Sequence, residues 1–536
     1  MSAVFFVILS VLSIYATSNP LDELATRIEG TILTQSSQEY DTIRQQFDLS
    51  LSKFPSTIIQ CKSVQDVKLS LQYTLDQDLE FVVRSGKHSL GGYSTCDGCV
   101  MIDLRLLNNI KINEKLSKTT VSVQPGVLIN ELFYELEFNT KSGKMYWLPA
   151  GVENVGIGGH VHGGGWGIGI RKYGMAMDNL VEAKVITVDN KKRVKIKRAS
   201  LKENAELFYC IRGTIGPSCG IVVEYTLKIY EQNENGYTLT NIDTYGTTPD
   251  YSAQLDRISV INSSVSDQQD HMMMNVHMKL NQPMDLPFIT TQMTYAFYDG
   301  DVINKEANFR QNLLTEIGGI GGIVSSNKTW HGSYVYIRCI FQVSASGQTD
   351  FSLCEDQEYL QIFTQIPGGI RIAGSLYDTE KEYDEFVSGD GYQFALNQII
   401  NNCPSTSIFC GYYTITWGGK MNEIESDETA FPWRDTKFAV NFINYFPVMI
   451  PDSAAVAWID DTYTNGLYRG GYTTGHGYVN YPVESLENED EYLSYYYGDN
   501  VDDIIISKCI RDPLNIFTNP QGIPTKHICV DLDLCN

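Results

Sequence analysis

After its first 18 residues the sequence has no apolar run approaching the roughly 20 residues of a membrane-spanning helix, and it is poor in basic residues. Among its 536 residues, 40 Lys and Arg stand against 64 Asp and Glu, a net charge of −24. So acidic a surface repels phosphate backbones and anionic lipids, so we expect neither nucleic acid nor a membrane as a partner. With 43% hydrophobic and 19% charged residues, the chain has a globular composition, and its length predicts two or three domains.

The common phosphate-binding and nucleophile motifs are also missing. No segment reads G-x-G-x-x-G, which disfavours a nicotinamide-binding Rossmann site. The Gly-Lys pairs are followed by His88 and Met421, so neither is a P-loop. Residues 216–220 read G-P-S-C-G and match the hydrolase elbow G-x-S-x-G. That elbow must lead into a helix, whereas the β-branched residues 221–225 predict a strand, so we reject a hydrolase.

The N-terminus predicts export. Residues 4–14 form an apolar run of signal-peptide length, and Ala16, Thr17 and Ser18 are small residues suited to a cleavage site. We therefore expect residues 1–18 to be a signal peptide and the mature protein to be secreted. The glycosylation sequons at Asn262 and Asn327 fit this route.

The twelve cysteines predict disulfides in an oxidising compartment. Cys96 and Cys99 form a CxxC, but no second CxxC follows, which disfavours a zinc knuckle. Cys529 and Cys535 bracket the C-terminal tail, where a local bridge between them could hold it. The pairing stays open at this point.

The hydrophobic pattern predicts an α+β fold. Short β-branched strands at 57–59, 81–83, 100–102 and 120–123 alternate with helical segments such as 63–75. Beyond residue 232 the strands become longer, more polar and more aromatic. In residues 272–280 methionines alternate with polar residues, which indicates one buried face of a sheet.

Residues 155–169 are unusually rich in glycine. Glycine costs backbone entropy, so a fold keeps so many only where the backbone approaches something closely, and successive N–H groups can cradle pyrophosphate oxygens. The interleaved Ile, Val and Trp argue against a flexible linker. His160 and His162 have no matching partners at helical spacing, so we expect no metal site.

Upstream, residues 84–92 read R-S-G-K-H-S-L-G-G directly after a predicted strand. This segment resembles the R-S-G-x-H-S motif of the berberine-bridge-enzyme-like flavoproteins, in the family with the vanillyl-alcohol-oxidase, or PCMH-type, FAD-binding fold. Further matching segments follow in the family's order, among them 148–151, 171–174, 429–432, 478–482, 496–500 and 512–517. The resemblance spans roughly residues 54–523.

The resemblance implies a two-part FAD-binding domain with an inserted substrate domain, built on an antiparallel sheet covered by helices. The limits we expect are 1–18 for the signal peptide, 19–235 for the first FAD-binding part, 236–480 for the substrate domain and 481–536 for the returning segment. His88 takes the position of the histidine that carries FAD covalently. The other cofactor contacts implied are Arg84, Ser85, Gly86, Lys87, Ser89, Val155, Gly156, Gly158, Gly159, His160, Gly163, Gly164, Gly165, Gly167, Gly220, Ile221, Val222, Tyr497 and Asn500.

One departure from the family pattern is informative. Many relatives hold the flavin by a second bond, through a cysteine in G-x-C-x-x-V-G, but residues 151–156 here read G-V-E-N-V-G. We therefore predict a single covalent link, through His88. Val155 resembles the family's gatekeeper beside the flavin, where valine accompanies oxidases, so dioxygen is the expected acceptor.

The resemblance also implies hydride transfer from a carbon bearing a hydroxyl or amine, with a base that removes the proton. The candidate bases are Tyr497, Tyr495 and Tyr481, with Tyr497 preferred because it lies beside Asp499 in the matching segment. A secreted sugar or alcohol is the first expectation for the substrate. The alternative is a flavin dehydrogenase acting on an aromatic or alkaloid-like substrate, or a catalytically decayed flavin- or carbohydrate-binding protein.

Overall fold

The computed structural model describes residues 19–115, 118–151, 154–232, 237–245, 271–280, 289–297, 323–332, 339, 354, 369–447, 453–525 and 529. The predicted signal peptide and the sequon at Asn262 lie outside these residues. Asn327 lies on a strand, β15 (Ile323–Gly332). No helix among the described residues is long and apolar enough to cross a membrane.

The N-terminal part contains a four-stranded sheet in the order β1-β2-β4-β3, in which β2, β4 and β3 run parallel and β1 antiparallel. Ser63 caps helix α3 (Val64–Asp76) through a reciprocal bond pair with Asp66, as its serine-to-acid spacing favours. The elements of this part are α1 (Pro20–Ala25), β1 (Thr31–Thr34), α2 (Tyr40–Ile43), η1 (Leu49–Leu51), β2 (Thr57–Gln60), β3 (Phe81–Arg84) and β4 (Val100–Asp103).

A second sheet, antiparallel and five-stranded, has the order β5-β6-β10-β8-β9. The glycine-rich segment follows β7 and contains α5 (Ile157–His162), and α6 (Ile170–Tyr173) comes directly after it. The apolar residues of both helices join the core beneath this sheet. The remaining elements are β5 (Ile110–Lys115), β6 (Lys118–Val123), α4 (Ile129–Phe138), β7 (Tyr146–Trp147), η2 (Ala176–Asn179), β8 (Leu180–Val188), β9 (Val194–Ala199), α7 (Ala205–Cys210), β10 (Ile221–Lys228) and β11 (Tyr230–Glu231).

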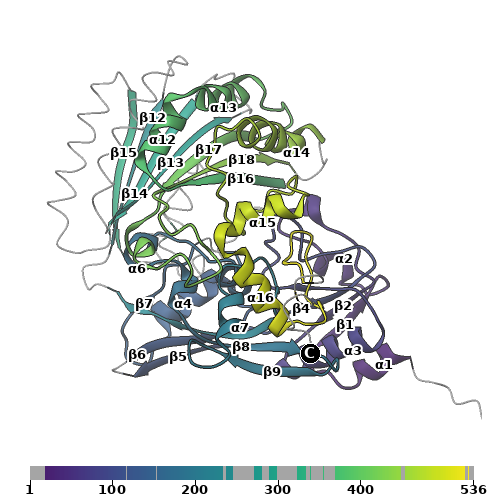
Figure 1. Ribbon diagram of the computed structural model, residues 1–536. Helices are drawn as coiled ribbons and strands as arrows, with labels where there is room; N and C mark the ends of the chain where they lie inside the picture. Colours follow the sequence, from purple (N-terminus) through teal and green to yellow (C-terminus); the bar gives the residue numbers. More distant parts are fainter. Residues whose placement is uncertain are drawn as a thin grey trace, which may run out of the picture.

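The third sheet has seven strands in the order β15-β12-β14-β13-β17-β18-β16, with every neighbouring pair antiparallel. Three helices, α12 to α14, lie on the face turned away from the other two sheets (Figure 1). The methionine-rich segment forms a strand, as predicted. The elements are β12 (Tyr237–Tyr245), β13 (His271–Leu280), β14 (Ile289–Phe297), β16 (Gly369–Tyr377), α12 (Glu380–Ser388), α13 (Asp390–Asn401), β17 (Phe409–Thr416), η4 (Gly419–Glu423), β18 (Phe438–Phe446), α14 (Ser453–Ile459) and the π-helical η5 (Asp460–Tyr468).

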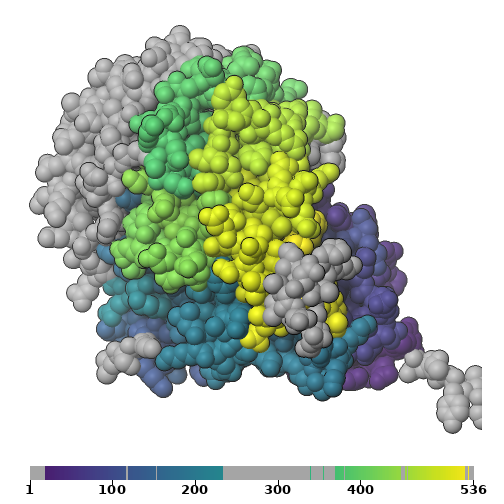
Figure 2. Space-filling model, viewed as in Figure 1, coloured from purple at the N-terminus to yellow at the C-terminus, as the bar shows by residue number. Residues whose placement is uncertain are grey.

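The last helices return to the N-terminal part. Helices α15 (Glu489–Tyr497) and α16 (Val501–Arg511), joined by η6 (Gly498–Asn500), run from the large sheet down to α7 (Figure 1). Figure 2 shows this segment, in yellow, on the surface between the two halves. The described elements confirm the α+β class, while the exact domain limits stay a prediction.

Five disulfides join described cysteines: Cys96–Cys99, Cys210–Cys219, Cys339–Cys354, Cys403–Cys410 and Cys509–Cys529. The suggested bridge from Cys529 to Cys535 is wrong, because Cys529 pairs with Cys509 on α16. The Cys509–Cys529 disulfide therefore links the C-terminal tail to α16. Cys61 is a buried free thiol.

Lys508 on α16 joins three segments inside the protein. Its side chain has 0% exposure, and its Nζ donates to Asp512 Oδ2 and Ser218 O at 2.7 Å each and to Phe517 O at 2.6 Å. Asp512 in turn accepts from the backbone N–H groups of residues 516 and 517. A buried ion pair with its other hydrogen bonds satisfied costs little to keep but much to break.

We therefore expect Lys508→Met to lower the free energy of unfolding by about 3–5 kcal/mol, because Asp512 keeps a buried charge without its cation. Chemical denaturation followed by tryptophan fluorescence measures this loss. The matched control is Lys381→Met, since Lys381 and Glu385 have the same i,i+4 spacing at 84% and 64% exposure. Equal small losses in both variants would contradict the structural role of Lys508.

Candidate active site

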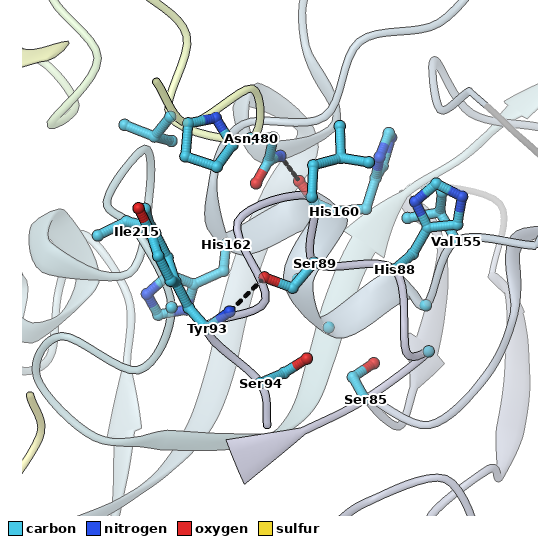
Figure 3. Close-up of a pocket in the computed structure, with 18 of the residues that line it drawn as sticks. Ser85, His88, Ser89, Tyr93, Ser94, Val155, His160, His162, Ile215 and Asn480 are labelled. Carbon is cyan, nitrogen blue, oxygen red and sulfur yellow. Dashed lines mark hydrogen bonds between the residues drawn. The ribbon is translucent and has the colours of Figure 1, made fainter. Parts of the chain in front are cut away.

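A cavity of about 380 Å³ lies where the three sheets meet. Its walls come from the loop after β3, the glycine-rich segment, residues 215–222, residues 478–482 and the strands β16, β17 and β18. Figure 3 shows His88 and Val155 on one side of this cavity and His162 and Tyr93 on the other. The volume is in the range of ligand and cofactor sites.

Two glycines let the two cofactor loops meet. A Cβ added at Gly86 would overlap the backbone nitrogen of Gly156, and one added at Gly156 would overlap that of Gly86. Gly159, by contrast, lines the cavity, and a Cβ there would have no atom within 4 Å. The glycine-rich segment thus meets protein on one side and open cavity on the other, which fits a backbone cradle for a large cofactor.

His88 lies at the cavity wall after a sharp turn. Lys87 takes a left-handed φ of 62°, which changes the chain direction directly after β3. The imidazole of His88 stacks on the ring of Phe47, with centroids 4.2 Å apart and an interplanar angle of 18°. Burial lowers the pKa of neighbouring Lys87. The stacking fixes the plane of the ring that the resemblance assigns to FAD attachment.

The histidines of the glycine-rich segment also line the cavity. His160 Nε2 accepts a hydrogen bond from Gly151 N at 3.3 Å, and His162 Nε2 lies 3.2 Å from Thr214 Oγ1. Burial lowers the pKa of His162 to about 4, so its ring is neutral at pH 7. Within the described part of the chain, no group of three or more His, Cys, Asp or Glu could hold a metal ion.

Three aromatic side chains meet at one hydroxyl in the cavity. The Trp166 indole Nε1 donates to Tyr481 Oη at 3.1 Å, and the Tyr413 hydroxyl is also bonded to Tyr481. Burial raises the pKa of Tyr481, whereas both of these bonds act to lower it. The same bond raises the pKa of Tyr413, so it favours the charged form of Tyr481 over that of Tyr413. Of these three polar groups, the hydroxyl of Tyr481 is therefore the one that is bonded to both of the others.

The other two candidate bases do not reach the cavity. The hydroxyl of Tyr497 accepts from Ile215 N at 3.2 Å, and burial raises its pKa. The hydroxyl of Tyr495 donates to Gly374 O and lies 2.8 Å from that of Tyr463. Asn500 donates to the carbonyls of Ser426 and Thr429. All three side chains are buried and none lines the cavity, so the preference for Tyr497 is replaced by Tyr481.

The other predicted cofactor residues divide into two groups. Arg84 is a buried structural residue, paired with Asp103 at 2.7 Å and absent from the lining. Gly163, Gly164, Gly165 and Gly167 are also absent from it, and Gly163 instead packs against the side chain of Asn480. The predicted residues that do line the cavity are Ser85, Gly86, Lys87, His88, Ser89, Val155, Gly156, Gly158, Gly159, His160, Gly220, Ile221 and Val222, with the candidate base Tyr481.

Several residues of the site were not predicted, among them Phe47, Trp166 and Tyr413. Phe47 and His88 are 41 positions apart, and Trp166, Tyr413 and Tyr481 come from three separate parts of the fold. No sequence pattern brings these residues together. The position of Trp166 inside the glycine-rich segment was the one available indication.

Comparison with known proteins shows which flavoproteins this chain resembles. A model described as "FAD binding domain" matches residues 55–195. "Berberine bridge enzyme-like 25" of Arabidopsis thaliana is 26% identical over 471 residues, 84% of this chain and 80% of that protein.

Two solved structures share the fold over almost the whole chain. Berberine bridge enzyme from Eschscholzia californica superposes with a TM-score of 0.74 at 19% identity, covering 95% of this chain and 99% of the other. A chitooligosaccharide oxidase also gives 0.74, at 21% identity, covering 95% and 100%. These likenesses confirm the PCMH-type α+β fold. The chain is thus similar over most of its length to the berberine-bridge-enzyme-like FAD-linked oxidoreductases.

Proposed function

We propose that this protein is a secreted oxidase with FAD linked through His88 alone, that it oxidises a CH–OH group of an alcohol or carbohydrate, and that dioxygen is the acceptor. The observation that carries the proposal is a doubly hydrogen-bonded phenol, Tyr481, in the same cavity as His88. A cofactor anchor and a candidate proton acceptor thus share one enclosed space. The five disulfides between described cysteines are consistent with an oxidising compartment.

The cofactor would be held mainly by backbone. Gly156, Gly158 and Gly159 expose main chain to the cavity, and residues 220–222 face it from β10. Small residues there leave room for rings and phosphates without side-chain clashes. None of the cavity-lining residues that the structure describes is a cysteine, which supports a single covalent bond.

When bound, FAD would supply a hydride acceptor for the alcohol carbon, and dioxygen would take up the two electrons to give hydrogen peroxide. The alcohol R–CHOH–R′ loses one hydride and one proton and becomes a carbonyl compound. The protein orients the substrate and takes the proton. Val155, which lines the cavity in the position expected for a gatekeeper, leaves space at this wall.

Tyr481 is our candidate for the proton acceptor. Phenolate is a strong acceptor for a hydroxyl proton, and the two donors on its oxygen stabilise the charged form. Burial opposes that charge and keeps the pKa above the ordinary value for tyrosine. The rate should therefore rise with pH as Tyr481 ionises.

Acid precipitation tests the covalent bond. The yellow colour of the wild-type protein should stay in the pellet, whereas His88→Ala should release it into the supernatant. The control His476→Ala alters a histidine outside the cavity lining and should keep a yellow pellet. Colour in the wild-type supernatant would contradict the histidyl bond. A protein that stays colourless after FAD supplementation would contradict the proposal that it is a flavin-dependent oxidase.

Substitution of Tyr481 tests the proton acceptor. Tyr481→Phe should lower kcat by about 10²–10⁴-fold, the usual contribution of a general base, with the flavin spectrum unchanged. Stopped-flow reduction of the flavin at a series of substrate concentrations measures this. A kcat within a few fold of wild type would remove Tyr481 from the reaction.

The pH profile tests the hydrogen bond from Trp166. Trp166→Phe removes one donor to the phenolate, which raises the pKa of Tyr481, so the rising limb of kcat/KM should move up by about one to two pH units. Trp458→Phe is the matched control, because Trp458 is buried elsewhere and its indole donates to Gln398 O. An unshifted limb in Trp166→Phe would show that the bond plays no part in the ionisation.

A further inference from the structure

The densest basic segment of this acidic chain lies on an outer strand. Residues 191–198 read K-K-R-V-K-I-K-R, so six of the 40 Lys and Arg stand within eight positions that contain no acid. An even spread of the basic residues would place fewer than one there. The segment forms a hairpin turn and most of strand β9, which pairs only with β8 among the described strands. This strand lies at the lower rim of the molecule, on the side away from the large sheet (Figure 1).

The turn before β9 is fixed by one carboxylate. Asp189 Oδ1 accepts from the backbone N–H groups of Lys191 at 2.9 Å and Arg193 at 3.0 Å. Asp189 Oδ2 accepts from Arg193 Nε at 2.7 Å. Lys192 takes a left-handed φ of 56°, and its carbonyl accepts from Gln72 Nε2 on α3 at 3.3 Å. The backbone positions of the basic residues are thus set before any ligand arrives.

Most of the positive charge on this segment is not neutralised by the protein. The four lysines are exposed, and within the described part of the chain none of them forms an ion pair; they are Lys191, Lys192, Lys195 and Lys197. The two arginines are paired, Arg193 with Asp189 and Arg198 with Glu182, but their side chains remain 58% and 59% exposed. All six cationic groups are therefore accessible to a ligand.

Protection of an outer strand against aggregation explains only part of this pattern. Lysine on an outer strand discourages pairing with another sheet. Strand β5, at the other side of the same sheet, has two lysines and one glutamate among its six residues. Residues 191–198 instead have six cations and no acid, in a chain whose overall charge is −24. So large a local excess is typical of a surface that binds an anionic polymer.

The form of the surface favours a linear polysaccharide among such polymers. Side chains alternate along a strand, so Lys195 and Lys197 lie on one face and Ile196 on the other. Binding to a membrane surface requires basic and apolar side chains on the same side, and binding to single-stranded nucleic acid uses aromatic residues on which bases stack. Residues 189–203 contain no aromatic residue. A flexible anionic chain can lie along one strand and stay clear of the acidic remainder of the protein.

We propose that residues 191–198 bind a sulfated linear polysaccharide, which would retain the exported protein on an extracellular polymer. Sulfate can be carried at more than one position of a sugar unit, so this polymer presents more anions along the strand than a polyuronate does. Binding releases the counter-ions condensed on the polymer, and no covalent bond changes. The extracellular partner rests on the secretion proposed above but not on the oxidase activity. None of the described cavity-lining residues comes from β9, so this surface is separate from the candidate active site.

Salt-dependent binding tests the partner. The fluorescence anisotropy of labelled heparin is measured with the flavin-loaded, full-length protein over a series of NaCl concentrations. We expect log K to fall linearly with the logarithm of the salt concentration. Unlabelled heparin should compete better than polygalacturonate, single-stranded DNA or phosphatidylserine vesicles. Absence of binding at low salt, or stronger competition by any of these three, would overturn the proposal.

Paired variants locate the binding on β9. The double variant Lys195→Gln, Lys197→Gln should weaken heparin binding by at least about ten-fold, because each lysine near an anionic surface contributes about five-fold. The slope of log K against log salt should become shallower by about 1–2. The control Lys111→Gln, Lys115→Gln removes the same charge from two exposed positions of β5 and should change heparin binding little. Equal losses in both double variants would show an effect of net charge and contradict a site on β9, with flavin content as the check on folding.

Turnover, measured separately, distinguishes this inference from the proposed function. If heparin binds but no alcohol is oxidised, the polysaccharide-binding surface stands and the oxidase function fails. If peroxide forms and heparin does not bind, the oxidase function stands and the polysaccharide-binding surface fails.

Discussion

The contact between the backbones of Gly86 and Gly156 is the constraint on which the site depends. Each glycine occupies the space that a Cβ on the other would need, so the loop after β3 and the start of α5 can meet without side chains between them. That contact places His88 and Val155 on the wall of one cavity. With larger residues the two loops would separate, and His88 and the glycine-rich segment would no longer line the same cavity.

Local sequence was enough to predict that these two segments come together. His88, Gly86, Gly156 and Gly159 lie in two short segments that line the cavity. The backbone conformation of such segments requires glycine, so clustered glycines in the sequence indicate it. The α+β class was predictable for a similar reason, because strand and helix periods are local. The Cys509–Cys529 bridge was not, since it depends on how the tail packs against α16.

The order of preference among the three candidate bases could not be predicted from the sequence. Tyr495 and Tyr497 stand in a segment that matches the family, but α15 buries their hydroxyls on backbone atoms and other tyrosines. Tyr481 precedes that helix and turns into the cavity, where it meets Trp166 and Tyr413. Among 33 tyrosines, only the three-dimensional contacts separate a structural phenol from one placed to accept a proton.

The two walls of the cavity are built by different means, and this bears on how the family diversifies. The cofactor wall is mostly backbone held by glycine, so few changes are compatible with it. The opposite wall includes side chains on β16, β17 and β18. The backbone hydrogen bonds that pair these strands do not depend on which side chains they carry. Substitutions there can change the ligand without disturbing the sheet, as in other folds that carry several functions. Distant relatives can therefore share a cofactor site while they differ in the ligand that the opposite wall binds.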